Sequence, residues 1–112
     1  MNSFKKVYVI TSFIPKGKVL TYKKVALLAG VATPRIVGFA LHVNKDTEKI
    51  PCHRVVGVNG DLTGYGRGGT KIKRQLLEQE GVRFKANGRI DMKKSLFIPT
   101  QKQLSKMEKT LS

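Results

Sequence analysis

The chain of 112 residues has a single cysteine, Cys52. One cysteine excludes an internal disulfide and cannot build a cysteine-rich metal site. Long apolar runs are also missing: Lys5 and Lys6 are followed by no stretch long enough for a signal peptide, and none of the chain reads as a transmembrane segment. We therefore expect a protein of the cytoplasm, associated with the nucleoid, or of the nucleus, neither secreted nor bound to a membrane.

Acidic residues are scarce, with 7 Asp and Glu against 22 Lys and Arg and a net charge of +15. None of them lies between Met1 and Lys45. A solvated surface usually mixes charges of both signs. A long segment that carries only positive charge indicates binding to a polyanion, of which nucleic acid is the commonest. Generic basicity, for solubility or in a ribosome-associated protein, is the alternative interpretation.

The length allows one modest core, so we expect a single domain. We place it at residues 1–99, followed by a basic C-terminal tail at residues 100–112. Apolar residues at helical spacing in this tail fit either a short amphipathic helix or a frayed end. The sequence shows no internal repeat.

The first half of the chain predicts three helices, at residues 3–14, 22–29 and 34–43. Thr33 and Pro34 form a strong helix start, with a hydroxyl cap and a proline at the first helical position. Two short helices joined by a tight glycine turn, behind a first helix and a short strand, fit a helix-turn-helix or its winged variant. Many other small helical domains would share this pattern.

The second half predicts a short β-hairpin and a fourth helix. Val55-Val56 and Leu62 flank turn residues at Asn59-Gly60. The helix runs from Lys71 to Glu80 with Ile72, Leu76 and Leu77 facing inward. We therefore predict a fold that is mainly α with a small β-hairpin. The glycine-rich residues 64–69 lack the strand-loop-helix surroundings of a dinucleotide fingerprint and are interpreted as a loop near a substrate.

Two residues of the third helix are unusual. Arg35 lies at the positive end of the helix dipole, so this cation is either solvated or has another task. Gly38 costs about 1 kcal/mol relative to alanine inside a helix. Close approach of a neighbouring helix or of a nucleic-acid backbone would explain the glycine.

Cys52 is followed directly by His53 in a segment with Pro51 before the thiol. A thiol is a nucleophile as the thiolate, and an imidazole held by a carboxylate could take its proton. Glu80 lies in the last turn of its helix, where the dipole disfavours an anion, and is the candidate partner of His53. From these residues alone, a buried structural cysteine beside a surface histidine remains the alternative.

Together these motifs resemble the C-terminal domain of the O6-alkylguanine-DNA alkyltransferases over about residues 17–81. The matching features are the Pro-Cys-His-Arg-Val segment at Pro51 to Val55, the Arg-x-Val-Gly stretch at Arg35 to Gly38, Asn44 between the arginine and the cysteine, the helix-start tyrosine Tyr22, the loop tyrosine Tyr65, and the Leu-Leu-x-x-Glu-Gly helix end at Leu76 to Gly81.

The resemblance implies a winged helix-turn-helix-like domain that binds the minor groove of double-stranded DNA and flips out an O6-alkylguanine. Cys52 would accept the alkyl group, with His53 as base and Tyr22 acting on the leaving guanine. No metal or organic cofactor is implied, and we expect a monomer. The implied catalytic residues are Cys52, His53, Glu80, Tyr22 and Asn44. The implied DNA-binding residues are Arg35, Thr33, Gly38, Lys23, Lys24 and Tyr65.

Some features depart from that pattern. The family's usual N-terminal domain is expected to be absent, and the loop at residues 66–69 is expected to be one residue longer. The ending at residues 87–99 resembles that of short alkyltransferase-like proteins, which bind alkylated DNA without repairing it and usually lack the cysteine. The alternative function is therefore a non-catalytic lesion sensor that recruits other repair proteins. A third is a generic basic DNA-binding domain.

Overall fold

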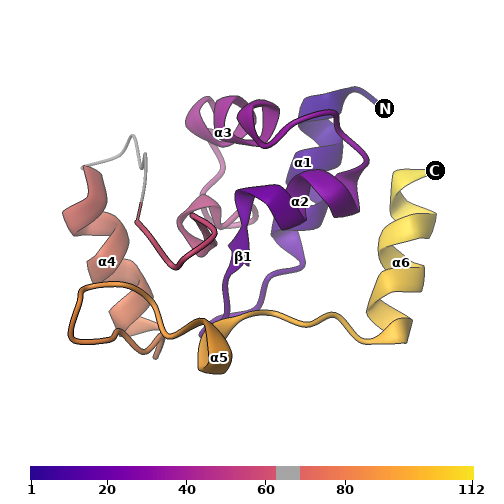
Figure 1. Ribbon diagram of the computed structural model, residues 1–112. Helices are drawn as coiled ribbons and strands as arrows, with labels where there is room; N and C mark the ends of the chain where they lie inside the picture. The colour runs from indigo at the N-terminus through magenta and orange to yellow at the C-terminus, as the bar shows by residue number, and fades with distance from the viewer. Residues whose placement is uncertain (63–68) are drawn as a thin grey trace.

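The computed structural model describes residues 1–62 and 69–112, and in this part it is mainly helical with a small sheet (Figure 1). This confirms the predicted fold class apart from the hairpin. The elements in chain order are α1 (Ser3–Ser12), β1 (Leu20–Thr21), α2 (Tyr22–Ala29), α3 (Pro34–His42), the 3-10 helix η1 (Cys52–Arg54), β2 (Val55–Val56), α4 (Gly69–Gln79), α5 (Met92–Ser95) and α6 (Gln101–Leu111).

Helices α1, α2 and α3 pack against one another, and their start and stop signals act as the sequence predicts (Figure 1). The Thr21 side chain accepts a hydrogen bond from Lys24 N, and the Thr33 side chain accepts one from Ile36 N. Gly30 ends α2 in the left-handed conformation, with φ of 71°, which a residue with a Cβ rarely adopts. The helix-turn-helix arrangement is therefore encoded locally.

The predicted hairpin is seen in its turn but not as a strand pair among the described residues. There, Val55-Val56 pairs with Leu20-Thr21 as a parallel two-stranded sheet. The turn itself forms, because Gly60 N donates to Gly57 O at 3.0 Å and Gly60 has φ of 81°. Both valines are fully buried, as is usual for a strand of a parallel sheet, whose two faces are covered by other parts of the fold.

Helix α4 buries the predicted Leu77 and half-buries Leu76, but not Ile72. Ile72, expected inside, is 37% exposed, while Lys73 is 1% exposed and Leu77 is fully buried. Lys73 precedes Leu77 by one helical turn, so the two share a face. Burial of a lysine needs polar partners.

The C-terminal residues form helix α6 and not a frayed end. Thr100 and Gln103 make a capping box at its start. Met107 is 2% exposed and joins the core cluster that includes Val7 and Ile10 of α1. In Figure 1, α6 and α4 stand on opposite sides of the α1–α3 group. The boundary placed between residues 99 and 100 stays a prediction.

Candidate active site and DNA-binding face

Cys52 opens the one-turn helix η1 and is 5% exposed. Two backbone hydrogen bonds fix the chain around it, from Cys52 N to Ile50 O at 2.8 Å and from Arg54 N to Pro51 O at 2.9 Å. Val55 follows η1 directly and belongs to the sheet, so the thiol is held between a rigid turn and a buried strand. The sulfur is thereby presented from a fixed backbone.

Asn44 fastens the segment that leads to the cysteine. Its Nδ2 donates to Ile50 O at 3.0 Å, and its Oδ1 accepts from Asp46 N at 3.0 Å. The side chain is 3% exposed. Asn44 therefore acts on Cys52 through the backbone of residue 50 and ties it to the end of α3.

His53 contacts Glu80, as the sequence analysis predicted. The distance from His53 Nε2 to Glu80 Oε1 is 3.0 Å. Burial, the largest influence, lowers the pKa of His53, and the charge of Glu80 opposes this only in part. The imidazole is therefore neutral near pH 7, and since a carboxylate only accepts, Nε2 carries the hydrogen and Nδ1 is the proton acceptor.

Arg54 shares the same carboxylate, which the sequence analysis did not foresee. Arg54 Nε and Nη2 donate to Glu80 Oε1 and Oε2 at 2.9 and 2.6 Å, and Nη1 donates to Ile14 O at 2.7 Å. Burial alone would raise the pKa of Glu80, but the Arg54 hydrogen bonds and His53 outweigh it and lower that pKa. Glu80 is thus kept ionised while it orients His53.

Lys73 is the second residue that the sequence analysis missed. Its Nζ donates to Val55 O at 2.6 Å and to the Tyr22 hydroxyl at 3.3 Å, and lies 5.5 Å from the centre of the Tyr22 ring. Burial lowers the pKa of Lys73 to about 8, although the charge of Cys52 opposes this. Its position one turn before the core residue Leu77 was the available signal.

Tyr8 joins α1 to α3 close to the thiol. Its hydroxyl donates to Ala40 O at 2.7 Å. Burial raises the pKa of Tyr8, and the charge of Cys52 raises it further, so the phenol stays protonated. Tyr22, at the first position of α2, packs against the same core cluster that contains Cys52. Side chains from α1, α2, η1 and α4 therefore meet around the cysteine.

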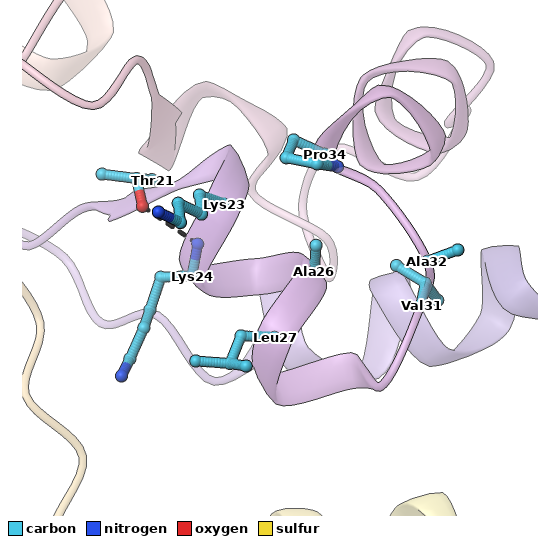
Figure 2. Close-up of a pocket in the computed structure, with 8 residues that line it drawn as sticks. All are labelled: Thr21, Lys23, Lys24, Ala26, Leu27, Val31, Ala32 and Pro34. Atoms are coloured by element: carbon cyan, nitrogen blue, oxygen red, sulfur yellow. Dashed lines mark hydrogen bonds between the residues drawn. The ribbon is translucent and has the colours of Figure 1, made fainter.

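Those predicted DNA-binding residues that the structure describes lie on α2 and α3 and, for Thr33, at the N-cap of α3. Arg35, Lys23 and Lys24 are exposed. In the described part of the chain, a Cβ added at Gly38 would meet nothing within 4 Å, so packing against a neighbouring helix does not explain this glycine. Figure 2 shows Lys23 and Lys24 beside a pocket of about 410 Å³ between α2 and the start of α3. Tyr65 lies outside the described residues.

Over residues 1–62 and 69–112, no three His, Cys, Asp or Glu side chains gather in a way that could hold a metal ion. In the same ranges no single helix has the length and apolar character to cross a bilayer. Only α2 and α3, taken as a pair bent by 99°, meet that test of length and composition.

The family model described as 6-O-methylguanine DNA methyltransferase, DNA binding domain, matches residues 2–82. The chain belongs to this family. The match begins well before Gly17, so α1 is part of the family domain as well.

The curated relatives are methylated-DNA--protein-cysteine methyltransferases. One from Saccharolobus islandicus is 54% identical over 71 residues, which are 63% of this chain and 45% of that protein. One from Methanothermobacter thermautotrophicus is 46% identical over 78 residues, which are 70% of this chain and 43% of that protein. The chain thus spans less than half the length of these relatives.

Solved structures of two kinds resemble the fold. The chain matches S. pombe Atl1 in complex with damaged DNA containing O6-carboxymethylguanine at a TM-score of 0.70 and 31% identity, over 87% of this chain and 95% of that one. It matches Mycobacterium tuberculosis OGT in complex with DNA at a TM-score of 0.66 and 40% identity, over 71% of this chain and 50% of that one.

Proposed function

We propose that this protein transfers the alkyl group of O6-alkylguanine in double-stranded DNA irreversibly to Cys52. The observation that carries the proposal is the contact of 3.0 Å between His53 and Glu80 directly beside the cysteine. A structural cysteine needs no oriented, neutral imidazole next to it. The names of the curated relatives support the same reaction.

The reaction begins with removal of the thiol proton. Neutral His53 takes this proton at Nδ1, through a water molecule, while Glu80 holds Nε2. The thiolate attacks the alkyl carbon on guanine O6, so that an S–C bond forms as the C–O6 bond breaks. The electron pair passes to the guanine. Because the resulting thioether is stable, each protein molecule acts once and needs no cofactor.

Tyr22 and Lys73 serve the leaving guanine. Tyr22 donates its hydroxyl proton to N3 of the guanine as negative charge develops there. Lys73, 3.3 Å from that hydroxyl and with a pKa of about 8, stabilises the phenolate or returns its proton. Asn44 contributes by positioning the backbone before Cys52.

DNA lies across α2 and α3 in this proposal. Lys23 and Lys24 contact phosphates, and the open space at Gly38 lets the helix approach the DNA closely. Thr33, whose hydroxyl caps α3, positions the turn before Arg35. Arg35 fills the gap left by the flipped guanine. Flipping costs a few kcal/mol, less for a damaged base, and phosphate contacts offset it.

A non-catalytic sensor is the second candidate function. The observation that favours it is the match with Atl1, which extends over 95% of that chain. In this role the protein would flip the lesion, leave it chemically unchanged and recruit other repair proteins. Either function is carried out where DNA is found, in the cytoplasm with the nucleoid or in the nucleus.

The intact mass of the protein separates the two functions. After incubation with an excess of duplex containing O6-methylguanine, we expect an increase of about 14 Da on a peptide that contains Cys52. The variant Cys52→Ala should bind the same duplex without any increase. Tight binding of the lesion by the wild type with no change in mass would contradict transfer and favour the sensor.

A further inference from the structure

The outward face of α3 carries an aromatic side chain between two basic ones. Arg35, Phe39 and His42 follow at intervals of four and three residues and therefore lie on one face of the helix. The opposite face is buried through Val37 and Ala40, both 0% exposed. Phe39 is 59% exposed and lies in the middle of the outward face.

This placement of Phe39 is not explained by the fold. Val43, one turn further along, is 50% exposed, so the apolar surface continues along the helix. Large aromatic groups are commonly buried, and exposed apolar surface often marks an interaction site. The ring is not part of the core cluster that packs α3 against α1 and α2.

The charge around Phe39 favours DNA as the occupant. Residues 1–45 contain no Asp or Glu, and Arg35 stands one turn before the ring. A nucleic acid supplies the matching anions together with apolar sugar and base surfaces. Gly38, next to Phe39, has open space where a Cβ would lie, so a ligand can approach the helix backbone here. Proteins that bind the minor groove often insert apolar side chains between base steps.

We propose that Phe39 is an apolar wedge that enters the minor groove beside the flipped guanine, one helical turn from Arg35. The inference rests on the proposed function, because it assumes that DNA binds across α3. Four residues of helix rise about 6 Å, and stacked bases are about 3.4 Å apart. The ring therefore reaches roughly two base steps from the position of Arg35 and loosens the stack there.

The wedge adds a part of the binding free energy that does not depend on counterion release. Lysine contacts to phosphates weaken steeply with salt, whereas contact of a ring with bases does not release ions. Removing Phe39 should thus lower affinity at every salt concentration by the same factor. Removing a lysine should instead change the salt slope.

The experiment compares full-length wild type with Phe39→Ala, Phe39→Leu and Ile98→Ala. Ile98 is 78% exposed and far from the helix-turn-helix in sequence, which makes it the matched control. Affinity is measured on an O6-methylguanine duplex over a salt series. The duplex carries 2-aminopurine at each of the first three positions beside the lesion in turn, so that unstacking is read as fluorescence.

For Phe39→Ala we expect affinity lower by roughly 5-fold to 150-fold, an unchanged salt slope and loss of the 2-aminopurine signal. Phe39→Leu should keep most of the affinity and most of the 2-aminopurine signal, since leucine also acts as a wedge. Ile98→Ala should match the wild type. If Phe39→Ala matched the wild type in DNA affinity and in 2-aminopurine fluorescence, the wedge would be overturned. The proposal of alkyl transfer to Cys52 would not be affected by that result.

Two other results would also overturn the wedge. One is a wild-type dimer in sedimentation that Phe39→Ala converts to a monomer, because the ring would then contact a second copy of the chain. The other is a wild type that binds no DNA, which would overturn the proposed function at the same time. A melting curve of Phe39→Ala, expected to match the wild type, shows that the variant is folded.

Discussion

Lys73 is a buried cation whose burial costs stability and which we propose assists alkyl transfer, and Lys73→Met separates the two effects. Burial lowers the pKa of Lys73 from 10.5 to about 8. A shift of that size corresponds to about 3 kcal/mol against the charged form in the folded protein. Methionine fills a similar volume without charge. It leaves Val55 O without the bond from Nζ, at a cost of about 1–3 kcal/mol.

The pH dependence of stability is the sharper measurement. Because the folded state binds the Lys73 proton less tightly than the unfolded state, stability rises with pH between about 8 and the unfolded value of 10.5. From about pH 7 to about pH 9.5 the gain from this one group is about 2 kcal/mol. Lys73→Met should lack this gain, while other groups titrate alike in both proteins and cancel.

The assay is urea unfolding of wild type and Lys73→Met at about pH 7 and about pH 9.5, with single-turnover alkyl transfer measured beside it. We expect the variant to be as stable as the wild type at the lower pH, or up to about 2 kcal/mol more stable, and to transfer at least about tenfold more slowly. Equal pH dependence in the two proteins would refute the reasoning, because Lys73 would then titrate as an exposed lysine does.

Two further predictions concern the neighbouring carboxylate and the flipping residue. Glu80→Gln should lower stability by about 2–3 kcal/mol in urea unfolding near pH 7, because Arg54 loses its anion. Because folding lowers the pKa of Glu80, the wild type should lose the stability that the Glu80 anion contributes as the pH falls through the folded pKa, whereas Glu80→Gln should show no such loss. Alkyl transfer by Glu80→Gln should also be slower, because His53 becomes a weaker base. Arg35→Ala should slow transfer by about 100-fold on a paired lesion and much less on a single strand, because unstacking is cheaper there. Lys23→Ala should weaken binding of both DNAs alike and reduce the log-log salt slope on the duplex by about 0.9. Equal effects of the arginine and lysine variants in single-turnover assays on both DNAs would contradict the role given to Arg35.

Local signals in the sequence were enough for the ends of α2 and α3 and for the contact between His53 and Glu80. Thr33 and Pro34 specify where α3 begins, and Gly30 specifies where α2 ends, because capping and left-handed backbone depend on neighbouring residues alone. The partner of His53 could be predicted because Glu80 stands at a helix end that disfavours it. Such features are encoded within a few residues.

Long-range pairing could not be read in the same way. Val55-Val56 is apolar throughout, so no alternation showed which strand or direction it would pair with. The burial of Lys73 depends on Val55 O and the Tyr22 hydroxyl, which only the folded chain brings within reach. No local signal sets Arg54 apart from the other cations of a basic chain, because its partners Ile14 O and Glu80 lie 40 and 26 residues away in the sequence.

The parallel pairing of β1 with β2 has a consequence for how the molecule folds. Helices α2 and α3 lie in the loop that this pairing closes, and η1, which begins with Cys52, directly precedes β2. The helices that we propose to bind DNA therefore cannot assume their final arrangement separately from the segment that carries Cys52. Closing such a loop is entropically costly and slow compared with forming neighbouring helices. Recognition and chemistry should accordingly appear together, in one late cooperative step.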